Sequence, residues 1–495
     1  MQKLKIILFL FIVGGFTVSC GEDFLTTSPT QDIDDSAVTS SPDNMMLGLN
    51  GIHREMYTRR GCQGCVGQSA LMIFNDALGE DFVLTNPNST WFYSQYRWTA
   101  HRNANARDTI WPWEFYYELI RNANVIIHGE ERVASNPEFT QDEINIPIGQ
   151  SYAYRAFFHF NLVQMYAERY DESGGNSQMG VPYMTAVVNE GKARDSVEDV
   201  YAMIHQDLDE AISRLEHYVR PNKSHFDASV VKGLKARVYL TQGNWEMAAQ
   251  YASEAREGTE LMTQDEYTSG FNDYNNREWM WASHVSADQS DRFGNFGAQV
   301  SRNNSTTFIR TTPIAINITL YYSFPQSDVR LANFDPTGEH EDLNLGSNFT
   351  RRPYTSQKFI APNENDSHID VPYLRAAELY LTEAEARANM GDDGRAAQVL
   401  YELVSARDDQ YTLSSNTGDD LLEEIYLNRR LELWGEGFRF FDLKRLNLPL
   451  DRTGANHNPT AANNFLEVEA GDKMWQYLIP EVEMHANPLM EQNPL

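Results

Sequence analysis

The chain reads Asn428-Arg-Arg-Leu-Glu-Leu-Trp-Gly-Glu-Gly-Phe-Arg-Phe-Phe-Asp-Leu-Lys-Arg445 close to its C-terminus. This stretch, which we name the signature, is dense in charge. Acidic and basic residues recur in it three or four positions apart, including Arg429, Arg430, Glu432, Glu436, Arg439, Asp442 and Arg445. Side chains at this spacing are neighbours on a helix and can form ion pairs and hydrogen bonds. We therefore expect the signature to lock the fold through a charge network.

The signature favours this structural role over an enzymatic one. Glu432 and Glu436 would lie on one face of a helix, at about the separation that a retaining glycosidase needs. A general acid must be protonated, however, and the neighbouring arginines would keep both carboxylates ionised. The sequence also lacks a His-Glu-x-x-His zinc helix, a Gly-x-Ser-x-Gly elbow, a phosphate loop and an EF-hand loop. We expect no enzyme activity.

A metal site is not expected either. Asp76, Glu80 and Asp81 could gather a cation, but no ligand spacing supports a site, and we interpret them as part of a solvated loop. No motif points to a cofactor.

Two segments upstream of the signature repeat one another. In each, a small residue is followed by a glycine seven positions later and an alanine pair five positions beyond it: Ala236, Gly243, Ala248 and Ala249, then Ala384, Gly391, Ala396 and Ala397. This spacing is typical of tetratricopeptide-like repeats, whose small residues let paired helices approach closely. Apolar periodicity predicts further helices over 113–126, 150–170 and 197–218, the last begun by Ser196. We expect a mainly α fold with a curved, tetratricopeptide-like helical layer.

The periodicity fades between about 263 and 365, where Asn, Ser, Thr, Gly and aromatic residues dominate. Long irregular stretches inside compact domains usually carry function or packing. Short strands are predicted at 278–285 and 307–312. We expect this excursion to form a loop-rich, ligand-binding face.

The N-terminus predicts export. Lys3 and Lys5 precede an apolar stretch at 6–16 that has the length of a signal-peptide core and is too short to span a bilayer. Thr17-Val-Ser-Cys20 resembles a bacterial lipobox, so we expect Cys20 to be acylated. Plain secretion with cleavage nearby is the alternative. The predicted organisation is a signal peptide at 1–19, a lipidated N-terminus and tether at 20–41, and a globular domain at 42–495 with helical parts at about 113–258 and 371–445.

The charge and apolar content of the chain exclude some classes of partner. The 495 residues carry a formal charge of −30 and no dense Lys/Arg run, so a nucleic-acid partner is excluded, since it would need a basic stripe. No later segment approaches the roughly 18 apolar residues of a spanning helix, so the lipid is the only expected membrane contact. Cys62 and Cys65 could close a local disulfide outside the cytoplasm. A thioredoxin-type redox motif is the alternative, but it should open a helix, whereas this context is typical of a loop.

An aromatic segment is the best candidate for ligand recognition. It reads Trp91-Phe92-Tyr93-x2-Tyr96-x-Trp98 and precedes several polar residues. Aromatic rings pack against the C–H faces of sugars, while amide and guanidinium groups bond the hydroxyls. A second cluster, in the irregular segment, could face the first across a groove. The candidate ligand-binding residues are Trp91, Tyr93, Tyr96, Trp98, Arg102, Asn103, Asn303, Tyr321 and Tyr322. For each ring, packing into the core is the alternative.

Several segments together resemble the SusD/RagB family of outer-membrane nutrient-binding lipoproteins. The signature closely matches that family's Arg-Arg-x-Glu-Leu-x-x-Glu-Gly-x-Arg pattern. Further matches are Arg375-Ala-Ala-Glu-Leu-Tyr-Leu381 with its following helix, Trp113-x3-Tyr117-x2-Ile120-x2-Ala123-Asn124, and the ending from Ile479-Pro480 to Pro494. Together these segments span nearly the whole chain after the signal peptide.

This resemblance implies a function and a partner. Members of the family capture glycans, or oligopeptides in the RagB branch, and pass them to a SusC-like TonB-dependent β-barrel transporter. The implied location is the outer membrane, facing the cell exterior, and Gly21-Glu-Asp23 resembles the acidic tripeptide that directs lipoproteins of Bacteroidetes-type bacteria there. We therefore expect a glycan-binding surface lipoprotein without enzyme activity. Oligopeptide binding is the alternative, and glycoside hydrolysis a remote one.

Overall fold

The computed structural model describes residues 35–88, 91–188 and 190–495. The predicted signal peptide, the lipidated Cys20 and most of the predicted tether lie outside the described residues. Residues 35–38, at the end of the predicted tether, form α2, which packs on α3 and α6, and Ser41 caps α3.

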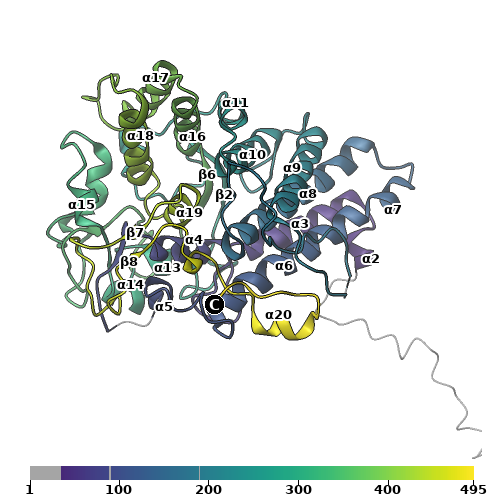
Figure 1. The fold of residues 1–495 in the computed structure, drawn as a ribbon, viewed down its shortest axis with the longest axis horizontal. Helices are drawn as coiled ribbons and strands as arrows, with labels where there is room; N and C mark the ends of the chain where they lie inside the picture. Colours follow the sequence, from purple (N-terminus) through teal and green to yellow (C-terminus); the bar gives the residue numbers. More distant parts are fainter. Residues whose placement is uncertain (1–34, 89–90, 189) are drawn as a thin grey trace, which may run out of the picture.

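The fold is mainly helical, as predicted (Figure 1). The helical part contains α2 (Asp35–Val38) and α3 (Pro42–Glu55), then α4 (Gly67–Leu78), α6 (Arg107–His128), α7 (Glu130–Ala134), α8 (Gln141–Tyr166), α9 (Val197–Arg214), α10 (Ala228–Gln242), α11 (Trp245–Ala255), α16 (Ala376–Asn389), α17 (Asp393–Val404) and α18 (Gly418–Glu432). The predicted N-cap of α9 is present, since the Ser196 side chain accepts a hydrogen bond from the Asp199 N–H.

The two predicted repeats form helix pairs. α10 packs on α11, α16 packs on α17, and α11 packs on α16, so the pairs continue one layer. Gly243 and Gly391 make the turns with positive φ angles of 71° and 77°, which explains the glycine at each turn. The alanines of both pairs are buried between the helices. The tetratricopeptide-like layer is therefore confirmed.

The loop-rich part lies at the lower left of Figure 1. Its short helices are α5 (Tyr93–Tyr96), α12 (Gln264–Tyr267), α13 (Phe296–Val300), α14 (Thr307–Thr311), α15 (Ile318–Tyr321), η2 (Val329–Asn333) and η3 (Glu341–Leu343); α19 (Arg439–Arg445), η4 (Lys473–Trp475) and α20 (Glu481–Ala486) follow. The strand predicted at 307–312 was wrong, because this segment forms α14, which buries Phe308 and Ile309.

Short antiparallel strands tie this part together. A four-stranded sheet has the order β1 (Phe82–Leu84), β3 (Ile314–Ile316), β5 (Thr355–Ser356) and β4 (Phe334–Asp335), and two pairs join β2 (Trp279–Ser283) to β6 (Val371–Arg375) and β7 (Leu450–Asp451) to β8 (Glu467–Val468). β2 confirms the strand predicted at 278–285. Because β1 pairs with β3 in register Phe82 to Ile316, the aromatic segment lies beside the irregular one.

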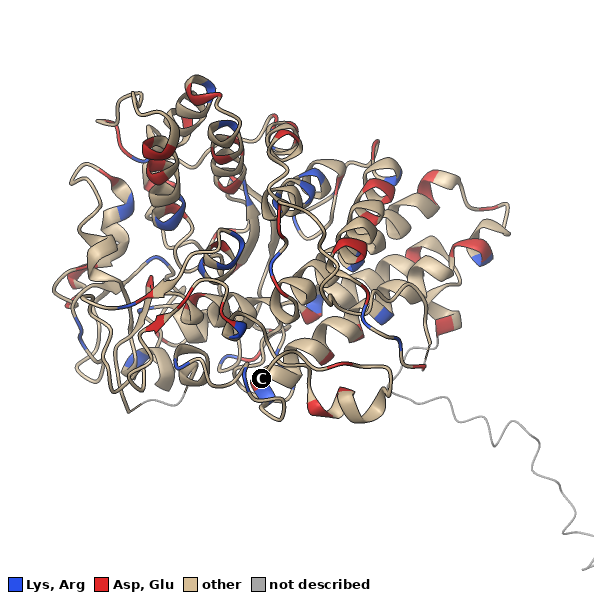
Figure 2. Ribbon diagram, in the orientation of Figure 1, with Lys and Arg blue, Asp and Glu red and all other residues tan. Residues whose placement is uncertain are grey.

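The signature forms the end of α18, a turn and α19. The predicted charge network exists, and Arg429 and Arg445 both bind Asp442 at 2.8 Å. Most of its other partners come from distant segments; Arg430, for example, lies 2.6 Å from Asp81. The network therefore joins the C-terminal helices to the N-terminal half. Figure 2 shows acidic and basic residues dispersed over the helices.

The turn of the signature gives a stability prediction. Gly437 has φ +87°, and an added Cβ would lie 2.6 Å from the Met72 Cα. Gly437→Ala should lower the free energy of unfolding by about 1–3 kcal/mol, because backbone must move. Gly51→Ala is the matched control: Gly51 lies within α3 with nothing within 4 Å of a Cβ, and alanine there should stabilise by about 0.5–1 kcal/mol. Urea unfolding of both variants checks this, and equal effects would contradict it.

Three buried histidines give a pH prediction. Burial lowers the pKa of His53, His101 and His457 to about 3, against about 6.5 in the unfolded chain. The unfolded state therefore binds more protons between these values. Stability should be complete above pH 6.5 and fall as the pH drops toward 3, each histidine contributing at most about 1.4 kcal/mol per pH unit. His53→Gln should make urea unfolding less pH-dependent in this window; an unchanged slope would contradict the assignment.

Candidate functional site

One cavity combines aromatic rings with free polar groups. It has a volume of about 280 Å³, and we name it the aromatic pocket; its lining residues are Gln63, Gly64, Phe74, Trp91, Phe92, Ser94, Gln95, Arg107 and Asp108. They come from the Cys62–Cys65 loop, α4, the start of α5 and the start of α6. This volume lies near the lower end of small-molecule pockets, about 300–1,000 Å³.

The aromatic side of the pocket is built from both halves of the chain. The half-buried Trp91 ring stacks on Phe308 of α14, with ring centres 5.5 Å apart and planes at 16°. Phe92 meets Phe308 edge-on at 5.3 Å and Phe74 at 5.8 Å. Trp91 is therefore held from behind, and its orientation is fixed before any ligand arrives.

The polar side carries a carboxylate, a guanidinium and an amide. Ser94 Oγ donates to Asp108 Oδ2 at 2.7 Å, and Arg107 Nε donates to Asp108 Oδ1 at 2.8 Å. Gln95 is 2% exposed, and its Nε2 has no hydrogen-bond partner among the described residues. Because buried donors are rarely left unpaired, a hydroxyl of a ligand or a water is expected there. These groups can bond sugar hydroxyls.

The backbone at the pocket is strained. Phe92 has φ +62°, in the left-handed region that bulky side chains avoid. Such conformations cost about 1–3 kcal/mol and cluster at ligand-binding sites. Phe92 lies directly before α5, between Trp91 and Ser94, which both line the cavity.

The cysteine loop forms one wall. Cys62 and Cys65 are joined by a disulfide. Between them, Gln63 Nε2 donates to the Phe293 carbonyl at 2.8 Å, and the Gln63 carbonyl accepts from Gln299 Nε2 at 3.1 Å. The loop is therefore fastened to the segment around α13, and it holds Gln63 at the mouth of the pocket.

Of the four predicted rings of the aromatic segment, only Trp91 lines the pocket. Tyr93, Tyr96 and Trp98 are 2%, 0% and 1% exposed. The Trp98 indole N–H donates to the Leu78 carbonyl at 2.9 Å, and its ring packs edge-on to Trp475. In this structure the core covers the faces of these three rings, and none of them lines the aromatic pocket.

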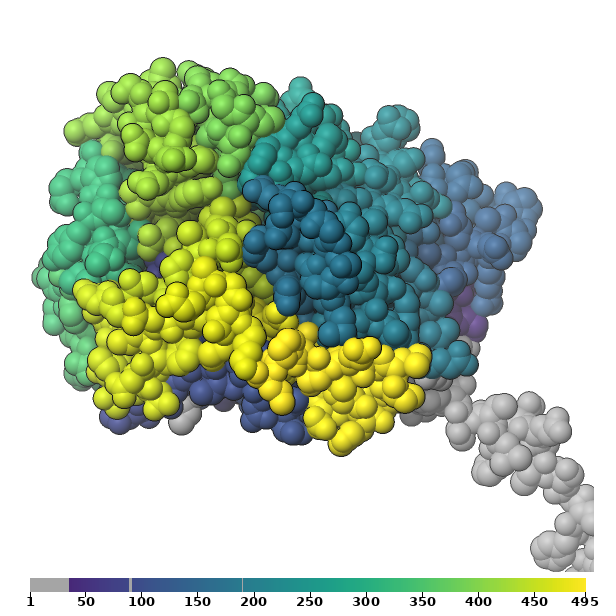
Figure 3. Space-filling model, in the orientation of Figure 1, coloured from purple at the N-terminus to yellow at the C-terminus, as the bar shows by residue number. Residues whose placement is uncertain are grey.

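Arg102 and Asn103 have other partners. The Arg102 guanidinium donates to the carbonyls of Lys473, Gln476 and Pro494 at 3.0, 2.8 and 2.5 Å. It therefore fastens the C-terminal segment, which lies across one face of the molecule in Figure 3. Asn103 is exposed, and its Oδ1 accepts from the backbone N–H two residues on. Neither residue lines the aromatic pocket, so their predicted ligand contact is not supported.

The second predicted cluster is a separate surface. Tyr321, Tyr322 and Tyr354, which we name the tyrosine cluster, lie at α15 and β5. Tyr322 is 68% exposed, and its hydroxyl lies 2.8 Å from that of Tyr354, whose φ is +62°. Asn303 instead exchanges two hydrogen bonds with the Ala361 backbone, at 2.8 and 2.9 Å. Among the described residues, none of these lines the aromatic pocket.

The acidic residues near β1 were interpreted wrongly as a solvated loop. Asp76, Glu80 and Asp81 are 4%, 6% and 5% exposed. Arg430 lies 2.6 Å from Asp81, and Arg439 binds Glu80. They are partners of the signature. Among the described residues, no group of three or more His, Cys, Asp or Glu is arranged to hold a metal.

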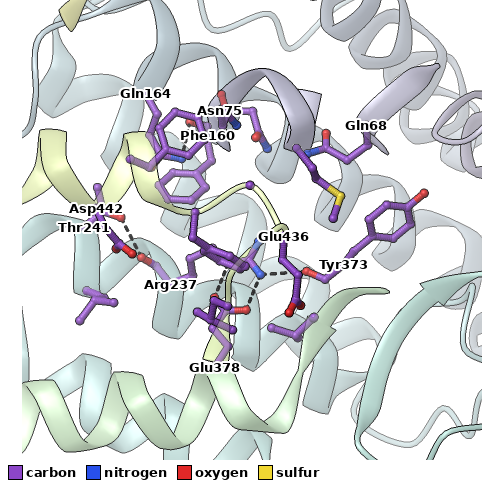
Figure 4. A pocket seen from close by; sticks show the side chains of 18 of the residues that line it. Gln68, Asn75, Phe160, Gln164, Arg237, Thr241, Tyr373, Glu378, Glu436 and Asp442 are labelled. Atoms are coloured by element: carbon purple, nitrogen blue, oxygen red, sulfur yellow. Dashed lines mark hydrogen bonds and ion pairs between the residues drawn. The ribbon is translucent and has the colours of Figure 1, made fainter. Parts of the chain in front are cut away.

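A charged chamber lies inside the fold at the signature (Figure 4). The Arg237 guanidinium donates two hydrogen bonds of 2.6 Å to the Glu378 carboxylate. Glu436 and Asp442 point into the same space. The free space is about 60 Å³, room for a few waters and well below the roughly 300–1,000 Å³ of small-molecule pockets. The chamber is a structural junction.

The signature carboxylates cannot act as a general acid. Burial alone would raise the pKa of Glu436, but the Arg375 and Lys358 cations outweigh burial and lower it. At Glu432, burial is likewise outweighed by the cations of Arg407, Arg375 and Arg330, which hold its pKa well below the usual range. Both groups therefore stay ionised, which a glycosidase acid does not.

Sequence reasoning missed residues that line the pocket, such as Gln63 and Asp108, and also Phe308, which supports Trp91 without lining the pocket. Phe308 lies more than two hundred positions from Trp91, and nothing local marks it as a partner. Asp108 had a weak signal, as an acidic residue in the first turn of a helix directly after the aromatic segment. Gln63 also had a weak signal in the sequence, since a residue between two bonded cysteines is held in a tight loop.

Two family models match the chain. One, described as "SusD family", matches residues 337–495, and another, described as "Starch-binding associating with outer membrane", matches residues 55–240. SusD-like protein P38 of Formosa agariphila is 22% identical over 404 residues, covering 69% of this chain and 73% of that protein. A SusD-like protein of Bacteroides ovatus is 22% identical over 470 residues, covering 86% and 79%.

Solved structures share the fold. A SusD-like carbohydrate-binding protein from Bacteroides vulgatus has a TM-score of 0.79 at 24% identity, covering 91% of this chain and 97% of that one. A laminarin-binding SusD-like protein has a TM-score of 0.69 at 22% identity, covering 91% and 99%. The similarity therefore extends over nearly the whole of both chains.

Proposed function

Because the chain belongs to the SusD/RagB family, we propose that it captures glycans at the cell surface and passes them to a TonB-dependent β-barrel transporter. The observation that carries glycan binding is the aromatic pocket, which is lined by a Trp91 ring held by Phe308 and by a carboxylate, a guanidinium and an amide side chain. A sugar ring offers one apolar C–H face and a rim of hydroxyls, which this arrangement complements. The names of the laminarin-binding neighbour and of the starch-binding family model support the same ligand class.

The proposed anchor is the acylated Cys20. It lies outside the described residues, as does the signal peptide. Within the described part of the chain, no helix has the length and apolar character to cross a bilayer. A lipid at Cys20 would hold the binding domain at the membrane, and residues 20–34 would add reach toward a neighbouring transporter.

A binding panel tests this function. The full mature chain is titrated calorimetrically with neutral storage and cell-wall oligosaccharides and, in parallel, with mixed oligopeptides. We expect binding to at least one glycan series and none to the peptides. Tight binding of peptides alone would establish the oligopeptide alternative, and release of shorter sugars from a bound glycan would establish an enzyme; either result contradicts the proposal.

A further inference from the structure

A second concave surface differs chemically from the aromatic pocket. We name it the apolar groove; it lies between α6, the segment around Met184 and α20, and has a volume of about 490 Å³. Ile120, Pro182, Met184, Ala186 and Val188 line it. Val188 is 50% exposed, a large fraction for an aliphatic side chain. A largely apolar concave surface of this size has the dimensions of a binding site for another molecule.

Two polar side chains at the groove floor are already bonded, whereas the Trp113 indole N–H, which also lines the groove, has no hydrogen-bond partner among the described residues. The Tyr117 hydroxyl donates to the Pro182 carbonyl at 2.8 Å, and Asn124 Nδ2 donates to the Met184 carbonyl at 3.0 Å. A sugar would bury most of its hydroxyls here against a floor with few free hydrogen-bonding groups, which is costly. Aliphatic or aromatic side chains would bury apolar area at no such cost. The floor therefore suits an apolar occupant.

The rim of the groove is negative. Its charged residues are Glu114, Glu118, Glu190 and Glu483 against Arg121 and Lys192. Both cations are already neutralised, by Asp35 at 3.5 Å and Asp195 at 2.6 Å. Glu114 and Glu190, in contrast, have no ion-pair partner among the described residues. The charge complement of this rim is a pair of basic groups.

We propose that the apolar groove docks a segment of a partner protein in which large apolar side chains are flanked by Lys or Arg. The apolar side chains enter the groove, and the flanking cations meet Glu114 and Glu190 at the rim. In groove recognition, apolar anchor residues commonly supply the affinity and charged residues the specificity. The inference does not depend on glycan binding, because the groove and the aromatic pocket share no lining residue.

Three peptides with capped ends test the docking of such a segment. They are fluorescein-Lys-Leu-Phe-Leu-Lys-amide, in which the dye caps the N-terminus, its Glu-flanked version, and a version with a Ser-Ser-Ser centre. Anisotropy is measured with the full mature chain at low and at physiological ionic strength. The Lys-flanked apolar peptide should bind at least tenfold more tightly than either control. Its advantage over the Glu-flanked peptide should shrink with salt, because rim charges are screened.

Matched variants locate the binding. Val188→Asp should weaken the first peptide at least tenfold, whereas Val219→Asp should leave it unchanged, because Val219 is 89% exposed and outside the groove. Glu114→Gln combined with Glu190→Gln should remove the preference for Lys flanks. Equal binding of all three peptides, or equal effects of the two valine changes, would overturn the proposal.

Two further outcomes would assign the groove to another occupant. If only peptides with free termini bind, the groove takes nutrient oligopeptides. If the chain self-associates and Val188→Asp abolishes this, the groove is an interface between two copies. Either result would also overturn docking of a partner segment.

Discussion

Arg375→Met should lower the free energy of unfolding by about 3–5 kcal/mol. Arg375 is 1% exposed, and its guanidinium binds Glu278, Glu432 and Glu436, all buried. Without this cation, the three carboxylates stay buried with fewer opposite charges to offset their lost hydration. The loss should appear in urea unfolding at neutral pH, followed by circular dichroism.

Two variants set the scale for this result. Arg395→Met removes a half-exposed arginine whose ion pairs measure 3.4 and 3.6 Å, and should cost less than about 1 kcal/mol. Arg375→Lys keeps the charge without the forked geometry and should fall between the two. If Arg375→Met costs no more than Arg395→Met, the signature network does not hold the fold.

Trp91→Ala should weaken glycan binding by about thirtyfold, equivalent to about 2 kcal/mol. The ring is the only aromatic side chain of the 91–98 segment that is partly exposed at the pocket, and Phe308 stacks behind it. Removing it takes away the surface on which a sugar face would pack. Calorimetric titration with the tightest glycan of the panel measures the change.

The control for this prediction is Trp245→Ala. Trp245 is a half-exposed tryptophan at the start of α11, outside the aromatic pocket. Its loss should leave glycan affinity unchanged. Tyr322→Ala reports on the tyrosine cluster: if it weakens binding as much as Trp91→Ala does, the ligand also covers that surface. Full affinity in Trp91→Ala would contradict the pocket assignment.

The helical layer could be predicted because its determinants are local. The spacing of Ala236, Gly243 and Ala248 specifies two helices and the turn between them within thirteen residues. The Ser196 cap and the apolar stripe of α9 are equally local. The spacing of charges within the signature was enough to predict a charge network. The partners outside the signature, such as Asp81 and Arg375, could not be predicted because they are distant in sequence.

The aromatic pocket was harder to predict because burial in a short irregular segment has no period. Trp91 and Trp98 look alike in the sequence, yet the first lines a cavity and the second is covered by Trp475. Positive φ angles at Phe92 and at Trp98 itself turn the chain and break any alternation of faces. Which ring faces outward is decided by Phe308 and the C-terminal segment, which fold onto α5 from elsewhere.

The position of a bound glycan tests glycan capture most directly. A crystal structure of the full mature chain with the tightest oligosaccharide of the panel would give it. We predict a sugar ring with its C–H face on Trp91 and with hydroxyls bonded to Asp108 and Gln95 Nε2. A glycan bound elsewhere, with the aromatic pocket empty, would contradict the central claim.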